Sequence, residues 1–492
     1  MRILFSVCMM LLTLTVTAQK GLPEDFLSSE FHKNRREALR GKMPENSVAV
    51  FFSNPVRNRA NDVDYVYHQD PNFYYLTGHK EPHAVLVVFS EHQTNSDGKR
   101  YNEILYVQER NARAEQWTGY RLGVEGAKEQ LGFEMAFNGK EFLESGIDFT
   151  SFDSVLYFDF KDDYRDSKRN TADLYSLIQS FKQQIHVLEA FDIDNKKDQI
   201  EEEQDTQVVQ SKVKIDTRTL GRLMAGLREV KTDEEMVLLK KAVRISAMGQ
   251  REVMKAMHPN MSETEVQGVH EYVYKKYGSE YEGYPSIVGA GHNGCVLHYI
   301  ENNKTKLGND LVLMDLGAEY HGYTADVTRT IPANGKFSKE QKQIYDLVYE
   351  AQEAGINATI VGNSMRDTDA ASREIINKGL VKLGIAKNEA DARQYFPHGT
   401  SHHIGLDVHD TNLRGAFVPN MVITVEPGIY IPEGSDCDEK WWGIAVRIED
   451  DILITENGPI NLSAEAPRKS DEIEALMKEE SVLSGLQLPK LD

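Results

Sequence analysis

The stretch from Met314 to Thr330, which reads MDLGAEYHGYTADVTRT, constrains the fold more than any other part of the chain. The apolar run that ends at Met314 is typical of a buried strand and places Asp315 at the strand's end. Gly317 and Gly322 interrupt the pattern and predict a tight return that brings Asp326 back beside Asp315. One aspartate after a strand is more often a turn residue than a ligand. Two brought together predict a cation site, provided that other residues join them.

The length and charge of the chain set the broad class. With 492 residues the chain is too long for one ordinary core, so two domains are expected. The formal net charge is −21. Nucleic acids and anionic membranes attract clustered lysine and arginine, so neither is expected as a partner.

The N-terminus has the pattern of a signal peptide, residues 1–18. A positive residue, Arg2, precedes an apolar run that ends at Val16, and small residues up to Ala18 form a cleavage site. The run is shorter than the roughly 20 residues that cross a bilayer, so we expect a cleaved signal and no membrane anchor. The protein is therefore expected to be exported, to the periplasm or outside the cell. Cys295 and Cys437 remain after cleavage, and the sequence leaves open whether they pair.

The first domain is expected over residues 19–226, as an α/β domain with a mixed sheet. Runs rich in β-branched and aromatic residues predict three strands, at 47–52, 84–89 and 103–107. The aromatic segment 65–78 either lines a pocket or packs in the core. The charge-rich stretch at about 192–206 predicts a solvated insertion or linker.

The second domain is expected over residues 227–480, with a tail at 481–492. Hydroxyl residues followed by an acid or amide three positions later mark three helix starts, at Thr232, Ser262 and Ser338. Two long helices precede a glycine-rich β segment and another follows it. This order indicates an α+β domain with helices on one face of a curved antiparallel sheet.

Further ligand candidates follow along the second domain, namely His402, Glu426 and Glu449. Each candidate acid lies in or beside an apolar β-type run, where an ionised carboxylate is costly without a partner. The nearby arginines are few, so metal cations are a better explanation of these acids than salt bridges. His403 stands beside His402, and chemistry alone leaves either as the ligand.

Four carboxylates and one imidazole form an oxygen-rich ligand set. Such a set suits hard or borderline cations, Mn²⁺ first, with Co²⁺, Zn²⁺ and Fe²⁺ as alternatives. It is too large for one tetrahedral zinc. It fits two ions about 3.5–4 Å apart, so two divalent metal ions are expected.

The order and spacing of these residues resemble the aminopeptidase P group of the pita-bread metallopeptidases, which also include prolidase and methionine aminopeptidase. The resemblance covers nearly the whole chain after residue 18. In the first domain it rests on SVAVFF, YVYHQDPNFYYLTGH and EQWTGYR. In the second domain it rests on His298, Asp315, Asp326, HGTSH ending at His402, His409, EPG from Glu426 and RIED from Arg447.

The resemblance implies a role for each ligand. Asp315 would bind one metal through both oxygens, and Asp326 and Glu449 would bridge the two metals. His402 and Glu426 would complete the other metal's ligands, and the motif favours His402 over His403. The substrate site would be formed by His298, His398, His409, Arg447, Tyr430 and Trp117.

The reaction implied is release of the first residue from a peptide whose second residue is proline. A hydroxide bridging the metals would attack the carbonyl before proline, with Glu426 carrying the proton. His409 would support the oxyanion, and His398 is expected as a further catalytic residue. The family often has an acid in the segment matching 69–73, where this chain has Asn72, so recognition of the free amine would need another group.

Two alternatives come from the same fold. A prolidase-type enzyme would use the same metals but cleave only Xaa-Pro dipeptides. A metal-free pita-bread protein would bind a ligand without this chemistry, although such relatives lose the metal ligands and all five are present here. Relatives also suggest a homodimer or homotetramer.

Overall fold

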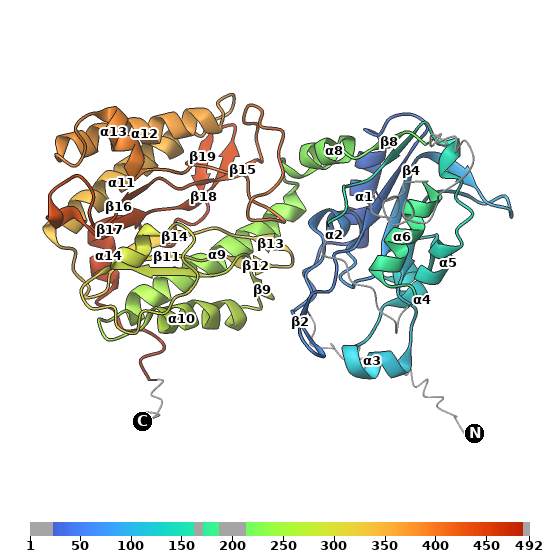
Figure 1. The fold of residues 1–492 in the computed structure, drawn as a ribbon, viewed down its shortest axis with the longest axis horizontal. Helices are drawn as coiled ribbons and strands as arrows, with labels where there is room; N and C mark the ends of the chain where they lie inside the picture. Colours follow the sequence, from blue (N-terminus) through green and yellow to red (C-terminus); the bar gives the residue numbers. More distant parts are fainter. Residues whose placement is uncertain (1–22, 162–170, 186–212, 486–492) are drawn as a thin grey trace, which may run out of the picture.

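The computed structural model describes residues 23–161, 171–185 and 213–485 (Figure 1). The chain forms two domains that lie side by side, with the N-terminal domain in blue to teal and the C-terminal domain in green to red. The boundary expected at residue 227 falls within helix α8 (Thr219–Arg228). The expected signal peptide (1–18), the acidic insertion (about 192–206) and the end of the tail (486–492) lie outside the described residues.

One six-stranded sheet forms the N-terminal domain, in the order β6-β5-β4-β1-β7-β8. The pairs β1–β4 and β4–β5 are antiparallel and the other three are parallel, so the sheet is mixed, as predicted. Its central strands are the three predicted runs. The bounds are β1 (Ser47–Phe52), β4 (Val85–Thr94), β5 (Arg100–Val107), β6 (Ala136–Asn138), β7 (Ser154–Leu156) and β8 (Ile215–Asp216), with a separate hairpin β2 (Asn58–Ala60) and β3 (Val63–Asp64).

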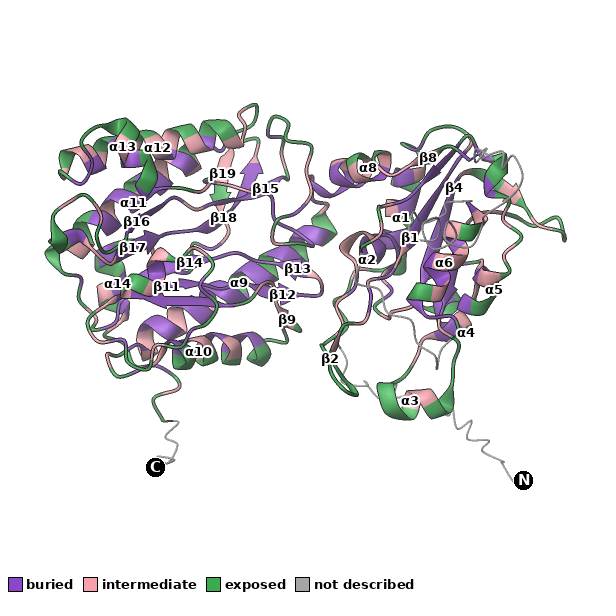
Figure 2. Ribbon diagram, in the orientation of Figure 1, coloured by how far each residue is buried: buried purple, intermediate pink, exposed green. Residues whose placement is uncertain are grey.

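Helices cover both faces of this sheet (Figure 1), and Figure 2 shows β1 and the first half of β4, at its centre, in the buried colour. The helices are α1 (Ser29–Arg40), α2 (Pro71–Thr77), α3 (Ala112–Thr118), α4 (Gly123–Glu129), α5 (Gly139–Leu143) and α6 (Leu174–Gln184). Part of the aromatic segment 65–78 packs in the core and another part lines a pocket. Phe73 and Tyr75 are buried in the core, whereas Tyr67 and His68 line a small cavity of about 120 Å³ against the second domain.

The C-terminal domain has the expected α+β architecture, and all of its strand pairs are antiparallel. The curved sheet is divided into four ladders, β13-β12-β9, β10-β11-β14, β15-β18-β19 and β16-β17. The bounds are β9 (Tyr281–Glu282), β10 (Ile287–Ala290), β11 (Leu311–Asp315), β12 (Ala318–Tyr320), β13 (Tyr323–Thr324), β14 (Thr328–Pro332), β15 (Val422–Val425), β16 (Gly428–Ile431), β17 (Ile444–Arg447), β18 (Asp450–Thr455) and β19 (Gly458–Asn461).

The helices of the C-terminal domain are α9 (Asp233–Ala256), α10 (Glu263–Lys276), α11 (Lys339–Ala358), α12 (Met365–Lys382), α13 (Glu389–Ala392) and α14 (Ser470–Leu476). Of these, α9, α10 and α11 pack on the sheet, α12 packs on α11, α13 packs on α12, and α14 packs on α9 and α11. Three of them begin where the sequence predicts. Thr232 and Ser338 form full capping boxes with Glu235 and Gln341. Ser262 caps α10 by accepting from the backbone N–H of Glu265. These caps satisfy helix N–H groups that would otherwise have no partner.

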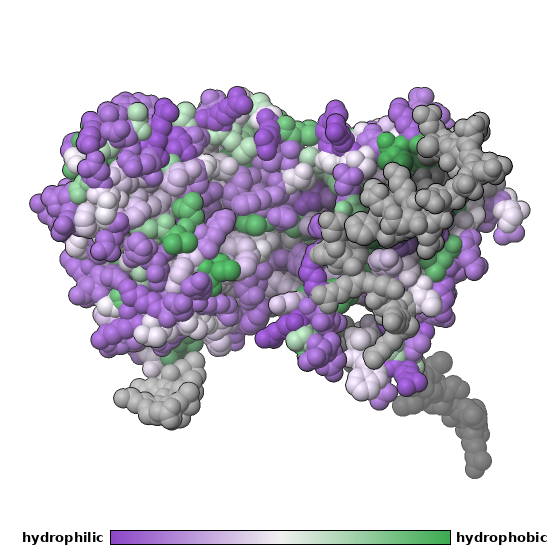
Figure 3. All heavy atoms as spheres, viewed as in Figure 1, coloured by the Kyte–Doolittle hydropathy of each residue, from purple (hydrophilic) through white to green (hydrophobic). Residues whose placement is uncertain are grey.

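The surface of the molecule is mostly polar on the face seen in Figure 3, with apolar residues in small separate patches. Among the described helices, none combines the length and the apolarity needed to cross a membrane. Cys295 and Cys437 are both free thiols, so the pairing that the sequence left open is not made.

Candidate metal centre

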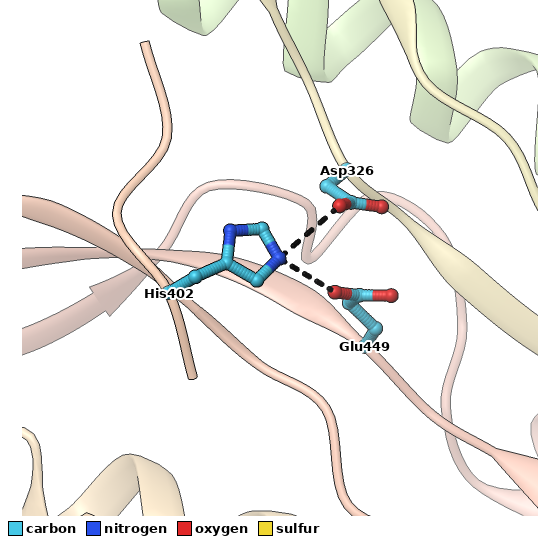
Figure 4. Close-up of side chains that lie close together, drawn as sticks. All are labelled: Asp326, His402 and Glu449. Carbon is cyan, nitrogen blue, oxygen red and sulfur yellow. Dashed lines mark ion pairs between the residues drawn. The ribbon is translucent and has the colours of Figure 1, made fainter. Parts of the chain in front are cut away.

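The acids singled out in the sequence converge on one cavity of about 630 Å³ in the C-terminal domain. Its walls include all five predicted metal ligands, namely Asp315, Asp326, His402, Glu426 and Glu449. One ligand atom from each of Asp326, His402 and Glu449 lies within 4.8 Å of the other two. Figure 4 shows the imidazole of His402 pointing at both carboxylates.

A strand and a tight return bring the two aspartates together. Asp315 ends β11, where it pairs in register with Thr328 of β14. Asp326 comes back two residues before β14. A side chain at Gly317 would place its Cβ 1.8 Å from the carbonyl oxygen of Ala325, so only glycine allows the two segments to come this close.

The second strand pair presents the two glutamates in a similar way. Glu426 directly follows β15, and Glu449 directly precedes β18. Val425 and Asp450 pair in register, so both acids project from the same end of the antiparallel ladder. His402 lies alongside β15, since its carbonyl accepts from the N–H of Thr424 at 2.9 Å.

The orientation of His402 distinguishes it from His403. Nδ1 of His402 lies 3.1 Å from the carbonyl oxygen of His403, which accepts its proton. Nε2 is left facing the carboxylates of Asp326 and Glu426, each at 3.5 Å. A backbone acceptor on one ring nitrogen is the usual support of a metal-binding histidine. His403 is buried and its backbone bridges to Ile423.

The chain supplies too little positive charge for these acids. Burial, with the charges of Asp326 and Glu426, raises the pKa of Glu449 well above its usual range. Burial also raises the pKa of Glu426, to about 7. Burial would lower the pKa of His402, but Asp326 and Glu426 outweigh it and raise that pKa to about 9. A buried carboxylate cluster that lacks compensating positive charge is suited to binding divalent cations.

Two residues that the sequence reasoning missed hold the acids in place. The hydroxyl of Tyr284 lies 2.6 Å from Asp315 Oδ1 and 2.5 Å from Asp326 Oδ1, so it can donate to either carboxylate. The hydroxyl of Thr328 donates to Glu449 at 2.6 Å. Only the tertiary structure identifies them, because a tyrosine in a turn and a threonine at a strand start are common.

The residues expected to contact substrate fall into two groups. His298, His398, His409 and Arg447 line the cavity with the acids. Tyr430 is buried behind them, accepts from Arg447 Nη1 at 2.9 Å and lies 2.8 Å from His398 Nε2. Arg447 also donates to Asp315.

Trp117 lies elsewhere in this chain. It sits near the end of α3 in the N-terminal domain, with 84% of its surface exposed. It is absent from the walls of the cavity. Asn72, in the segment where the resemblance led us to expect an acid, accepts a hydrogen bond from Arg228 Nη1 at 2.7 Å.

Each of the two domains matches a known protein family. Residues 237–456 match the model of metallopeptidase family M24, and residues 32–148 match that of the aminopeptidase P N-terminal domain. The chain is 36% identical to an Xaa-Pro aminopeptidase of Escherichia coli, over 92% of this chain and 98% of that protein. It is 30% identical to human Xaa-Pro aminopeptidase 3, over 91% of this chain and 84% of that one.

The chain is also similar to solved structures of aminopeptidase P. Aminopeptidase P from E. coli with the inhibitor Pro-Leu matches with a TM-score of 0.78 and 35% identity, covering 92% of this chain and 98% of that one. A zinc-substituted form of E. coli aminopeptidase P in complex with product matches with a TM-score of 0.77 over the same shares.

Proposed function

The chain belongs to metallopeptidase family M24, of the aminopeptidase P type, and from this we propose that it is an Xaa-Pro aminopeptidase. It would release the N-terminal residue from peptides with proline in the second position. The observation that carries the proposal is the convergence of four acids and His402 on one cavity whose walls also hold three histidines. That donor set suits divalent cations, which activate water for peptide hydrolysis.

We propose two divalent ions at this centre, with Mn²⁺ favoured by the oxygen-rich donors and Co²⁺, Zn²⁺ or Fe²⁺ as alternatives. Asp315, Asp326, His402, Glu426 and Glu449 would hold them. When bound, such ions lower the pKa of water toward neutrality and polarise a carbonyl oxygen. The raised pKa values of Glu426 and Glu449 support this proposal, because burial, together with the charges of the neighbouring acids, disfavours their ionised forms and a bound cation would stabilise them.

Glu426 is suited to carry the proton. Its carboxylate lines the cavity and lies 3.5 Å from Nε2 of His402 and 3.6 Å from Nδ1 of His398, beside the water that the centre would hold. Glu426 would take the proton from the attacking water and deliver it to the nitrogen of the leaving proline. That nitrogen carries no hydrogen before cleavage, so it must receive one when the bond breaks.

A chain of hydrogen bonds holds His398 in one orientation. Arg447 Nη1 donates to the hydroxyl of Tyr430, which in turn donates to His398 Nε2. Nδ1 of His398 then donates to the carbonyl of Gly399 at 2.8 Å. Burial lowers the pKa of His398 to about 4, with the charge of Arg447 adding to it, so the ring is neutral. A fixed neutral ring can pack against proline, while His409, which also lines the cavity, would support the oxyanion.

A peptide series separates the candidates. The protein loaded in turn with Mn²⁺, Co²⁺ or Zn²⁺ would be given Xaa-Pro-Xaa peptides, the same peptides with alanine for proline, and Xaa-Pro dipeptides. We expect release of the first residue from the proline tripeptides, with Mn²⁺ the most effective ion. Cleavage of dipeptides alone would instead assign a prolidase-type enzyme.

We also propose that the protein is exported and assembles with copies of itself, as a homodimer or homotetramer. The N-terminal pattern of residues 1–18 supports export. The exposed side chains of Trp117 and Tyr120 support self-association, since large exposed aromatics are common at interfaces. Mass spectrometry of the mature N-terminus and light scattering of the purified enzyme test the two proposals.

A further inference from the structure

Two buried glutamines lie behind the four acids, one in each half of the catalytic domain, and neither has a place in the steps above. Gln250 is on α9 and Gln352 on α11, and both are completely shielded from solvent. Each lies six residues before the last residue of its helix, because α9 ends at Ala256 and α11 at Ala358.

Gln250 joins the two segments that carry the aspartates. Its Nε2 donates to the carbonyl of Met314 at 3.1 Å and to that of Val327 at 2.7 Å. Met314 directly precedes Asp315, and Val327 directly follows Asp326. Both acceptors are carbonyl oxygens, so only the amide nitrogen can face them, with one hydrogen for each.

The amide oxygen of Gln250 indicates that this side chain does more than fill space. Oε1 of Gln250 is buried and has no hydrogen-bond partner among the described residues. A buried polar atom without a partner is destabilising, so an apolar side chain would fill the same space at lower cost. The two donated hydrogen bonds are therefore the contribution that only the amide can make.

Gln352 joins the two segments that carry the glutamates. Its Nε2 donates to the carbonyl of Val425 at 3.1 Å and to Asp450 Oδ2 at 2.9 Å. Val425 directly precedes Glu426, and Asp450 directly follows Glu449. Oε1 accepts from Arg468 Nη1 at 3.0 Å, which fixes the orientation of the amide.

The two arrangements form a structural repeat within the domain. The interval from Gln250 to Gln352 is 102 residues, the same as the interval between the N-cap residues of α10 and α12, Ser262 and Ser364. In both halves the glutamine reaches an antiparallel strand pair, β11–β14 or β15–β18. It meets each pair at the residues that flank its two acids.

We propose that Gln250 and Gln352 are positioning residues that set the spacing of the acids in each strand pair and so hold the centre ready for two divalent ions. The inference rests on the proposed metallopeptidase function. Like-charged carboxylates push the strand ends apart, and each amide ties those ends together one residue away from the acids. Metal–ligand distances tolerate errors of about 0.2 Å, so a small widening weakens binding.

The test replaces each amide by a side chain of similar length that cannot donate, in Gln250→Met and Gln352→Met. Binding of Co²⁺ to the metal-free protein would be followed by calorimetry and by visible absorption. We expect about 10–100-fold weaker Co²⁺ binding and a changed absorption spectrum, as for other residues that support metal ligands. With metal in excess, kcat should fall while KM changes little.

Ser372→Ala is the matched control. Its buried hydroxyl donates to the carbonyl of Ala351 at 2.9 Å, a hydrogen bond that joins α12 to α11. This variant should lower the melting temperature but keep the Co²⁺ affinity and spectrum. Gln352→Glu is a second test variant. It keeps the shape of the side chain and the oxygen that accepts from Arg468, but replaces the Nε2 donor by a carboxylate oxygen. It should therefore also weaken Co²⁺ binding.

Unchanged Co²⁺ affinity and spectrum in both methionine variants, with only a lower melting temperature, would overturn the proposal and leave the glutamines a purely structural role. Failure of the proposed function has a different signature. There the unmodified protein would bind Co²⁺ but leave Xaa-Pro peptides intact, and the effect of the glutamines on Co²⁺ binding could still be measured.

Discussion

At the scale of single residues, the hydrogen bonds of each histidine separate the metal ligand from the substrate contact, whereas distance to the acids does not, since His398 and His402 lie 3.6 Å and 3.5 Å from Glu426. Asp326 faces His402 Nε2 at 3.5 Å and lies beside the hydroxyl of Tyr284. His398 is tied instead to Tyr430 and to the carbonyl of Gly399. Loss of the Asp326 side chain and loss of the His398 side chain should therefore have different effects on metal content and on turnover.

Asp326→Ala and His398→Ala test this difference. We expect Asp326→Ala to lose bound metal and to reduce peptide cleavage to background. His398→Ala should keep its metal and lower turnover by about 10²-fold, the scale of a lost group that stabilises the transition state. Metal analysis beside steady-state kinetics checks both. Normal turnover in Asp326→Ala would contradict the two-metal centre, and loss of metal from His398→Ala would contradict its placement as a substrate contact.

Tyr284→Phe removes one hydroxyl that contacts two ligands. Without it, Asp315 and Asp326 lose a shared donor that keeps their oxygens together. We expect metal affinity to fall about 10–100-fold with the fold intact. Titration of metal-free protein with Co²⁺ measures the change, and Tyr430→Phe is the comparison, since Tyr430 contacts Arg447 and His398 rather than a carboxylate.

At the scale of elements, the helix pair α9 and α10 packs on the sheet at β10, β12 and β13 and contains a buried histidine. His270 of α10 packs on Gly249 of α9, where an added Cβ would lie 2.9 Å from the ring. The ring nitrogens have no hydrogen-bond partner among the described residues. Burial lowers the pKa of His270 to about 3. The folded state therefore holds this ring neutral at every pH where the protein is stable.

This histidine should make the enzyme sensitive to acid. Below pH 6.5 the unfolded chain binds a proton at His270 that the folded chain does not, so stability falls as pH falls toward 3. One such group costs about 1.4 kcal/mol between pH 7.5 and 5.5. In His270→Leu the fall in melting temperature over this range should be smaller, whereas replacing the exposed His92 by Gln should leave it unchanged. An equal fall in His270→Leu would contradict this prediction.

At the scale of the whole molecule, a buried ion cluster joins the two domains beside the active site. Asp410 follows His409 in sequence, accepts from Lys231 Nζ at 3.1 Å and also pairs with Arg228. Arg228 in turn contacts Asn72 of the first domain. Burial alone would raise the pKa of Asp410, but the two cations outweigh it and keep that pKa low.

Asp410→Ala should destabilise the enzyme strongly. It leaves two buried cations without their partner, which costs about 3–5 kcal/mol. Urea unfolding measures the loss, and kcat should fall as well because His409 is the adjacent residue. Asp436→Ala, which breaks an exposed pair with Lys387, should leave the urea midpoint unchanged. A similar small effect in Asp410→Ala would show that the domains do not depend on this cluster.

Local patterns in the sequence were enough to predict many of the elements. The capping residue Thr232 predicts the start of α9, and the run 47–52 predicts β1, because helix caps and β-type runs act over a few residues. The candidate ligands could be named because burying an acid without a partner is costly wherever it stands. Their assignment to one site required a resemblance to known metallopeptidases.

Only the tertiary structure decided what surrounds those acids. Tyr284, Gln250 and Gln352 carry no sequence signal of their role, since a tyrosine in a turn and a glutamine in a helix are ordinary. Their importance comes from hydrogen bonds to residues 31 to 98 positions away. The sequence by itself determined which residues could bind metal, because the charge of a side chain and the apolar pattern of the residues beside it are local properties. The spacing of those residues is a long-range property, and folding brings the two halves of the domain together to create it.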